Sequence, residues 1–261
     1  MNTGAVNADV TAAQVKLYTQ ELKMPGLRHH FEEIAREARA NGESHEAYLV
    51  ACLRAEIESR REHRLQDRLK QARFPQRKTL EEFDFTLVPS VPKEEVIHLG
   101  TAEFVRAREN VIFLGASGTG KTHLAQAIGQ AAIYAGVRVR FMSAVVLAQE
   151  LLSAQDEHRL PRYLKTWQRT DLVIIDELGY LGLGPGGPLL FQFFAERYEK
   201  ASVLVTSNLE FSRWSEVFGD PVLTAALLDR LTHHSHILVF EGESYRFRES
   251  QGRKTKNQRN P

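Results

Sequence analysis

The sequence predicts an α/β protein in which a doubly wound parallel sheet follows a small all-α domain. Five short apolar runs alternate with stretches of helical character, as buried parallel strands do. These runs cover residues 111–115, 137–143, 171–177, 202–208 and 236–240. Before them, apolar residues recur three to four positions apart without a strand pattern, which indicates helices. We therefore expect a helical domain for partner or DNA interaction over 1–75, the α/β domain over 76–245, and a basic tail over 246–261.

The composition is that of a folded globular protein. Hydrophobic residues make up 43% and charged residues 26% of the 261 positions, which excludes a disordered chain. The single cysteine, Cys52, excludes an intrachain disulfide and fits a reducing compartment. No leader-like segment and no run of about 18 apolar residues is present. We expect a cytoplasmic protein without a membrane partner.

We expect two or three helices in the N-terminal domain, after a first dozen residues that we expect to be frayed. The first lies between Pro25-Gly26 and Asn41-Gly42. The second begins near Ser44, a suitable N-cap, and ends before Pro75. Its apolar residues share one face: Leu49, Leu53, Ile57, Leu65 and Leu69.

A phosphate-binding motif follows the first apolar run directly. Residues 115–122 match the pattern G-x-x-x-x-G-K-[ST] in full, with a strand before it and a helix after it. This context disfavours a chance glycine-rich turn. The loop would turn its N–H groups toward the phosphates, Lys121 would bridge the β- and γ-phosphates, and the Thr122 hydroxyl would bind Mg²⁺. The predicted nucleotide-binding residues are Gly115, Ala116, Ser117, Gly118, Thr119, Gly120, Lys121 and Thr122.

Two carboxylates end the third apolar run, in the segment "LVIIDELG". Asp176, at the tip of a buried strand, is placed to bind Mg²⁺ together with Thr122, and Glu177 is placed to polarise an attacking water. Many P-loop kinases lack the second carboxylate because their nucleophile is a substrate hydroxyl. The pair therefore favours hydrolysis over phosphoryl transfer to a metabolite.

Asn208 ends the fourth apolar run, in "SVLVTSN". A short amide at a strand tip can reach the γ-phosphate and the attacking water from the neighbouring strand. The alternative is an N-cap for the next helix, since asparagine and serine favour that position. Because the phosphate-binding motif and the carboxylate pair are also present, we prefer the catalytic interpretation of Asn208.

With these residues in view, the chain resembles the AAA+ ATPases of the DnaA/DnaC clade and, within it, the IstB-type transposition helper proteins of bacterial insertion sequences. The likeness runs through nearly the whole chain, in "GLRHHFEEIA", "ARFPQRKTLEEFDF", "GASGTGKTHLAQAIG", "VIIDELGYL", "RYEKASVLVTSNLEFSRWSEVFGD", "AALLDRLTHHSHIL" and "GESYR". It implies that Asn208 is sensor 1 and that Arg230 is an arginine finger acting on a neighbouring subunit. It also implies ATP and Mg²⁺ as cofactors, assembly as a homo-oligomer on double-stranded target DNA, and recruitment and stimulation of a DDE-type transposase.

The C-terminal end departs from many members of the clade. About twenty residues follow the last expected strand, too few for a packed helical lid. We therefore expect the lid domain and its sensor 2 arginine to be absent. Arg246, in "GESYR", is a candidate substitute.

Two basic stretches are candidates for DNA contacts, although the net charge is only +1. Arg60, Arg64 and Arg68 are four residues apart on the second N-terminal helix. A solvated face with acidic partners nearby remains the alternative there. The second stretch is an extra helical insertion over 157–170, where the residues to test are Arg159, Arg162 and Lys165.

Two other functions remain open at this point. A DnaC-like replicative helicase loader would carry much the same ATPase domain, so the N-terminal domain decides between the two. A metabolic P-loop kinase would act without DNA. DNA stimulation of ATP hydrolysis separates that class from the other two.

Overall fold

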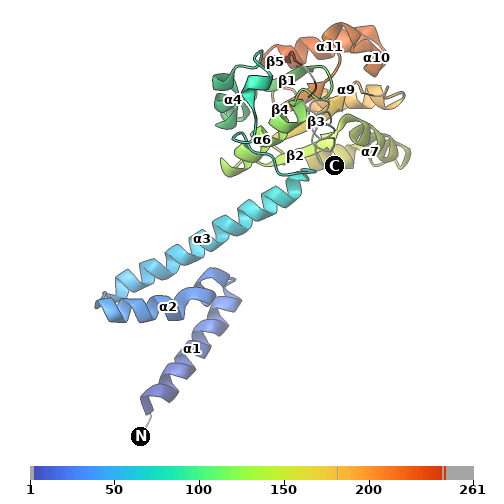
Figure 1. Cartoon of the computed structure of the whole chain (residues 1–261). Helices are drawn as coiled ribbons and strands as arrows, with labels where there is room; N and C mark the ends of the chain where they lie inside the picture. The colour runs from blue at the N-terminus through green and yellow to red at the C-terminus, as the bar shows by residue number, and fades with distance from the viewer. Residues whose placement is uncertain (1–2, 181, 243, 245–261) are drawn as a thin grey trace, which may run out of the picture. The chain divides into compact units, whose positions relative to one another are not determined.

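The computed structural model describes residues 3–180, 182–242 and 244, with side chains from residue 10 onward (Figure 1). The chain divides into two compact units, Met1–Asp67 and Arg68–Pro261. This division falls before the domain boundary expected after residue 75. Arg246 and the rest of the tail 246–261 lie outside the described residues. In the part of the chain that is described, each helix is either too short or too polar to cross a bilayer.

The first unit is built from α1 (Thr3–Glu21), α2 (Pro25–Asn41) and α3 (His45–Ala72), the last of which continues into the second unit. The expectation of a frayed first dozen residues is wrong from Thr3 onward, where Gly4 is the only helix-breaking residue in α1. Gly42 ends α2 in the left-handed conformation, with φ 65°. Ser44 caps α3, as expected, by accepting a hydrogen bond from the N–H of Ala47 at 3.2 Å.

The buried residues of α3 within this unit are not the leucines and isoleucine that share its apolar face. Cys52 and Glu56 are buried, whereas Leu49, Leu53 and Ile57 keep between 43% and 55% of their surface exposed. The Glu56 carboxylate accepts hydrogen bonds from the N–H of Leu27 at 3.0 Å and from Nε of Arg60 at 2.6 Å. Glu56 of α3 thus binds a backbone N–H at the start of α2.

The second unit contains a five-stranded, all-parallel sheet, which confirms the expected fold class. Its strand order is β2-β3-β4-β1-β5, so β4 lies between β1 and β3. The strands are β1 (Asn110–Gly115), β2 (Val139–Ser143), β3 (Leu172–Leu178), β4 (Ser202–Ser207) and β5 (Ser235–Phe240). Each overlaps the apolar run from which it was predicted.

Helices cover both faces of this sheet, as a doubly wound fold requires. On one face α6 (Lys121–Tyr134) contacts β1 to β4, and Gly129 lies against Ile174 of β3. The other face is covered mainly by α7 (Ala144–Asp156) and α9 (Gly186–Arg197). The remaining helices are α4 (Lys93–Gly100), α5 (Glu103–Ala107), α8 (Leu160–Trp167), α10 (Ser215–Phe218), α11 (Pro221–Thr232) and the 3-10 turns η1 (Phe85–Leu87) and η2 (Phe211–Arg213).

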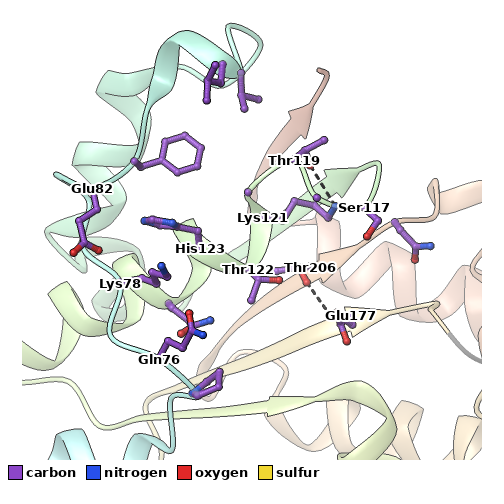
Figure 2. Close-up of a pocket in the computed structure, with 18 of the residues that line it drawn as sticks. Gln76, Lys78, Glu82, Ser117, Thr119, Lys121, Thr122, His123, Glu177 and Thr206 are labelled. Carbon is purple, nitrogen blue, oxygen red and sulfur yellow. Dashed lines mark hydrogen bonds between the residues drawn. The ribbon is translucent and has the colours of Figure 1, made fainter. Parts of the chain in front are cut away.

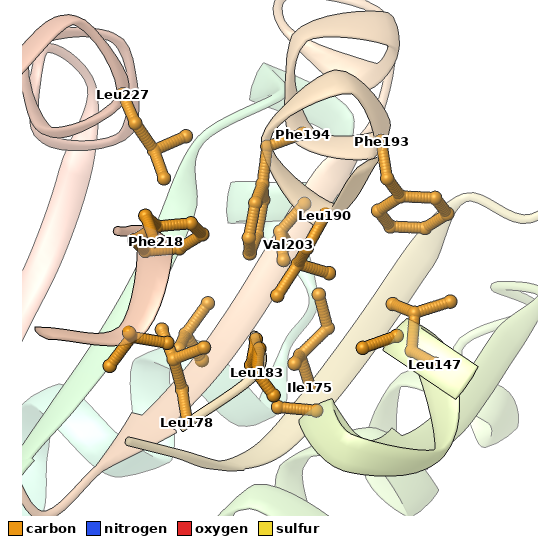
Figure 3. Close-up of a cluster of buried hydrophobic side chains, with 14 of the residues drawn as sticks. Leu147, Ile175, Leu178, Leu183, Leu190, Phe193, Phe194, Val203, Phe218 and Leu227 are labelled. Atoms are coloured by element: carbon orange, nitrogen blue, oxygen red, sulfur yellow. The ribbon is translucent and has the colours of Figure 1, made fainter. Parts of the chain in front are cut away.

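A large apolar cluster holds α9 on the sheet (Figure 3). Leu190 and Phe193 of α9 are almost completely buried with Ile175 of β3 and Val203 of β4. Each such side chain stabilises the fold by about 1.5–3 kcal/mol. The cluster keeps the β3 and β4 tips, where the polar motifs begin, in fixed positions.

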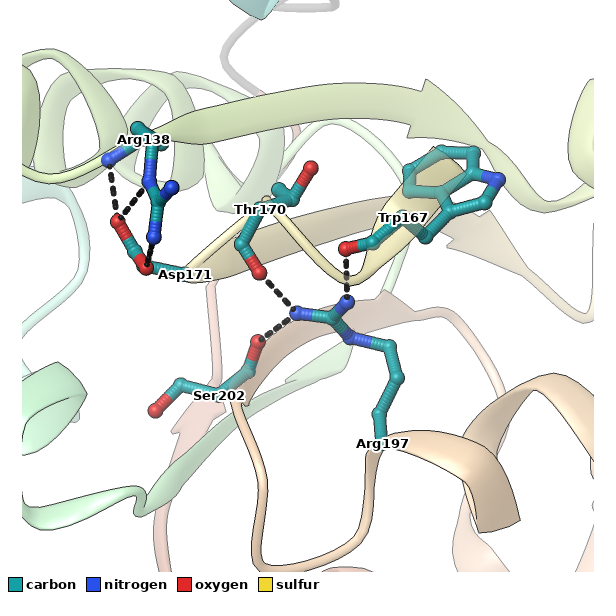
Figure 4. A network of polar contacts seen from close by, with 6 residues as sticks. All are labelled: Arg138, Trp167, Thr170, Asp171, Arg197 and Ser202. Atoms are coloured by element: carbon teal, nitrogen blue, oxygen red, sulfur yellow. Dashed lines mark hydrogen bonds and ion pairs between the residues drawn. The ribbon is translucent and has the colours of Figure 1, made fainter. Parts of the chain in front are cut away.

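Arg197 connects the end of α8 to the start of β4 through hydrogen bonds (Figure 4). Its side chain is 5% exposed and donates hydrogen bonds to the carbonyls of Trp167 (3.2 Å), Thr170 (2.9 Å) and Ser202 (3.5 Å). Burial lowers the pKa of Arg197 to about 10, so the group is still a cation at neutral pH. One side chain therefore anchors the end of α8 and the start of β4.

Candidate nucleotide site

The predicted phosphate loop connects β1 to α6. Gly115 has φ 143° and Gly120 has φ 97°, conformations that side chains rarely adopt. A Cβ on Gly115 would lie 2.3 Å from the carbonyl oxygen of Phe240, and one on Gly120 would lie 2.6 Å from the Phe83 ring. The glycines of the motif are therefore required by close packing as well as by the turn.

Lys121 lies over this loop. It is 8% exposed, and its ammonium donates hydrogen bonds to the carbonyls of Gly115 and Ala116, both at 2.6 Å. The N-terminus of the 14-residue α6 starts at the same residue. A cationic side chain and the positive end of a helix thus meet at one point, an arrangement that binds phosphate.

A pocket of about 720 Å³ opens beside the loop, a size that suits a nucleotide. The residues from Ser117 to His123 form one wall, together with Glu177, Thr206 and Asn208. Gln76, Lys78 and Glu82 stand on the other wall, across from Lys121 and Thr122 (Figure 2). The sequence interpretation assigned no role to this second wall, although "ARFPQRKTLEEFDF" was one of the segments that carried the family resemblance.

Side-chain contacts hold the second wall against α6. The His123 ring contacts the Thr79 carbonyl through Nε2 at 3.1 Å and packs edge-on against Phe83, with ring centroids 5.4 Å apart. Gln130 donates a hydrogen bond to the Lys78 carbonyl at 2.8 Å. The segment therefore belongs structurally to the pocket.

Asp176 and Glu177 lie at the tip of β3 in contrasting environments. Asp176 is 5% exposed, and its Oδ1 accepts hydrogen bonds from the hydroxyls of Thr122 at 2.9 Å and Thr206 at 2.5 Å. Burial raises the pKa of Asp176, while those two hydrogen bonds and the charge of Lys121 oppose the rise. Glu177 is exposed and lines the pocket.

Asn208 follows the tip of β4 and also lines the pocket. The Ser207 hydroxyl shapes this turn by donating to the Leu178 carbonyl at 2.8 Å and accepting from the N–H of Leu209 at 3.1 Å. The next helical segment, η2, has Glu210 at its N-cap. Asn208 therefore does not cap it, and its position at the pocket fits the catalytic interpretation.

Arg230, on α11, lies near the end of β1 that is opposite to the phosphate loop. Its guanidinium stands 5.9 Å from the ring centre of Tyr198, and Asn110, at the start of β1, donates to the neighbouring Leu231 carbonyl at 3.2 Å. The phosphate loop follows the other end of β1, six residues on, or about 17–20 Å at the usual rise of a strand. Arg230 is thus remote from the phosphate loop of its own chain.

The first group of candidate DNA contacts is partly engaged within the chain. Arg60 binds Glu56 and also donates to the Lys23 carbonyl at 3.1 Å. Arg64 is exposed, while Arg68 is partly buried and belongs to the second unit. The three arginines therefore do not form one uniformly available stripe.

The second group lies on α8. Arg159 forms an ion pair with Glu157 at the start of the helix. Arg162 and Lys165 are exposed one helical turn apart, and Arg169 is exposed just after the helix ends. The apolar face of α8 packs on the core through residues such as Leu164 and Trp167. The basic face therefore points away from the core.

Known proteins of similar sequence are named as ATP-binding proteins, which agrees with a phosphate loop beside the pocket. A family model described as IstB-like ATP binding protein matches residues 17–253. The chain is 42% identical over 247 residues to the ATP-binding protein of insertion sequence IS21 from Pseudomonas aeruginosa, covering 94% of this chain and 93% of that one. It is 41% identical over 233 residues to the ATP-binding protein of insertion sequence IS5376 from Geobacillus stearothermophilus, covering 89% and 93%.

Solved structures share the fold of the second unit. AMPPCP-bound DnaA from Aquifex aeolicus superposes with a TM-score of 0.54 at 21% identity, over 70% of this chain and 56% of that one. The DnaC helicase loader superposes with a TM-score of 0.50 at 22% identity, over 62% and 96%. At these identities the likeness concerns the fold alone, and it agrees with the α/β P-loop fold expected from the sequence.

Proposed function

Because this chain belongs to the family of IstB-like ATP-binding proteins, we propose that it is an ATP-dependent, DNA-binding regulator of DNA transposition. In this proposal it assembles as a homo-oligomer on double-stranded target DNA, then recruits and stimulates a DDE transposase. Two relatives that align with about nine-tenths of the chain bear the names of insertion sequences, which supports a role in transposition.

ATP hydrolysis is the reaction that the site supports best. The observation that carries it is the position of Glu177 and Asn208 on the wall of the pocket that holds the phosphate loop. Lys121 would bind the β- and γ-phosphates, Glu177 would polarise the attacking water, and Asn208 would orient that water toward the γ-phosphate. A neighbouring chain would supply Arg230, because within one chain that residue lies near the end of β1 opposite to the phosphate loop.

The residues at the pocket also fit Mg²⁺. The Thr122 hydroxyl and the Asp176 carboxylate are in direct contact, and oxygen ligands of this kind are those that Mg²⁺ prefers. When bound, the ion would neutralise negative charge on the phosphates. Thr122 and Asp176 are the residues that would hold it.

For DNA we favour the exposed basic face of α8, formed by Arg162, Lys165 and Arg169. Arg162 and Lys165 lie on one face of α8 and Arg169 follows its end; among the described residues, none of the three has an ion pair like those of Arg60 and Arg159. Lys and Arg side chains bind DNA through its phosphates largely without regard to base sequence.

The test is to measure ATP hydrolysis by the full chain with and without double-stranded DNA, and then to capture partners on that DNA in the presence of ATP. We expect DNA to stimulate hydrolysis and the cognate transposase to be retained. Retention of the replicative helicase instead would favour the helicase loader. DNA-independent phosphoryl transfer to a small molecule would overturn the proposal in favour of a kinase.

A further inference from the structure

The pairing of β3 with β4 is irregular beside the two carboxylates. Ile175 pairs with Val205, but the next aligned pair is Leu178 with Ser207, so the register shifts between them. Two residues of β3, Asp176 and Glu177, thus oppose the single Thr206 of β4. An extra residue of this kind bends a strand and leaves a backbone group without its ladder partner.

Glu177 occupies the left-handed region, with φ 60°. A side chain other than glycine is rarely found there unless its surroundings hold it. This backbone turn separates the directions of the two carboxylates. Asp176 is buried, while Glu177 is exposed toward the pocket.

Thr206 supplies the contacts that the ladder lacks. Its side chain is 1% exposed, and its hydroxyl accepts the N–H of Glu177 at 2.9 Å, as Figure 2 shows. The same hydroxyl donates to Oδ1 of Asp176 at 2.5 Å. A single hydroxyl therefore uses both its proton and a lone pair on two adjacent residues of the candidate hydrolytic centre.

We propose that Thr206 is a positioning residue for hydrolysis, which acts by holding Glu177 in the conformation that turns its carboxylate into the pocket. This inference rests on the proposed ATP hydrolysis. Valine at this position keeps the shape of threonine but can neither donate nor accept, so the Glu177 N–H loses its partner. Serine keeps both functions of the hydroxyl.

The experiment compares Thr206→Val with Thr206→Ser in the full chain, with DNA present. For Thr206→Val we expect kcat to fall about 10–100-fold, the range typical when a hydrogen-bonding partner that orients a metal-binding residue is removed. Binding of a fluorescent ATP analogue should remain nearly unchanged, because Lys121 and the phosphate loop are intact. Thr206→Ser should restore most of the kcat.

Thr224→Val is the matched control. Thr224 is also a buried threonine, 4% exposed, and its hydroxyl donates to the Asp220 carbonyl at 2.7 Å on α11, outside the pocket. This variant should lose stability without losing kcat. A similar loss of kcat in both threonine-to-valine variants would overturn the positioning role.

A double-mutant cycle with Glu177→Gln completes the test. If Thr206 acts through Glu177, then Thr206→Val should cause much less additional loss once the Glu177 carboxylate is gone. Independent, additive losses would overturn the inference, and so would an unchanged kcat in Thr206→Val. A wild-type chain that hydrolyses no ATP would overturn the proposed function itself, and the positioning role with it.

Discussion

Thr122 and Asp176 are joined by a hydrogen bond of 2.9 Å between side chains that are 54 residues apart in the chain. The bond connects the first turn of α6 to the tip of β3, and so brings the phosphate-binding motif and the acidic motif together. Thr206 contacts the same carboxylate oxygen from β4. The start of α6 and the tips of β3 and β4 thus meet at one buried carboxylate oxygen. Because each of them contributes a different side chain, we expect substitutions of single residues there to have distinguishable effects.

Lys121→Ala and Glu177→Gln should behave in opposite ways. Loss of the Lys121 charge should abolish nucleotide binding and with it the ATP-dependent assembly. Loss of the Glu177 carboxylate should leave binding intact and slow hydrolysis by about 10²–10⁴-fold, the usual contribution of a general base. Nucleotide binding and the lifetime of complexes on DNA are the measurements. Equal loss of nucleotide binding in both variants would show that the assigned roles are wrong.

Arg230→Ala should bind ATP almost normally yet hydrolyse it about 10³–10⁵-fold more slowly, the range measured for arginine fingers. Mixing Arg230→Ala with Lys121→Ala should restore part of the activity. In the mixed assembly, an intact phosphate loop on one chain can meet an intact Arg230 on another. ATPase assays on the mixture, with co-assembly demonstrated separately, check this. If co-assembled chains stay inactive, Arg230 is not a finger acting between subunits.

Reversing the charges of Arg162 and Lys165 together should weaken DNA binding. It should also make the binding constant less dependent on salt concentration. Each phosphate contact contributes about −0.9 to the slope of log K against log salt, so losing two should flatten the slope by roughly two. Arg60→Glu is the comparison, and it should change the slope less because Arg60 is engaged with Glu56. A larger effect from Arg60→Glu would place the DNA contact on α3 instead.

Glu56 should make the first unit sensitive to acid. Burial raises the pKa of Glu56, but the hydrogen bonds from the Arg60 side chain and the Leu27 N–H outweigh it, so the pKa lies below the usual value of a glutamate. A carboxyl whose pKa is lower in the folded state stabilises the fold above its unfolded pKa, and the contribution is lost as the pH falls through the folded pKa. Glu56→Gln should remove this dependence. Far-UV circular dichroism of both proteins from pH 7 to pH 2 checks it, and parallel acid transitions would contradict it.

Arg197→Met should destabilise the second unit by about 2–4 kcal/mol, because carbonyls of Trp167, Thr170 and Ser202 would lose a buried donor. Arg138→Met is the control, since Arg138 pairs with Asp171 while remaining 52% exposed. That variant should cost less than about 1 kcal/mol. Urea unfolding followed by tryptophan fluorescence suits this comparison, because Trp167 and Trp214 are both buried in this unit. Equal losses would show that the Arg197 network contributes little.

The elements of the second unit could be predicted because their signals are local. Apolar runs of strand length, the loop from Gly115 to Thr122 and the pair Asp176-Glu177 each lie within a few consecutive residues. The strand periodicity and the turn-forming glycines act over that same short range. For this reason the five strands and the motifs at their tips were recognisable before any contact was known.

Contacts between segments that are distant in the chain leave no such local pattern in the sequence, so they could not be predicted. The order β2-β3-β4-β1-β5 brings Thr206 beside Asp176, and it depends on how helices pack on both faces of the sheet rather than on any one strand. The wall from Pro75 to Val88 likewise depends on its packing against α6. In the first unit, helical spacing placed Leu49, Leu53 and Ile57 on one face, but the buried Glu56 contacts the start of α2. Periodicity identifies which residues share a helix face, whereas only the packed neighbour determines which face is buried.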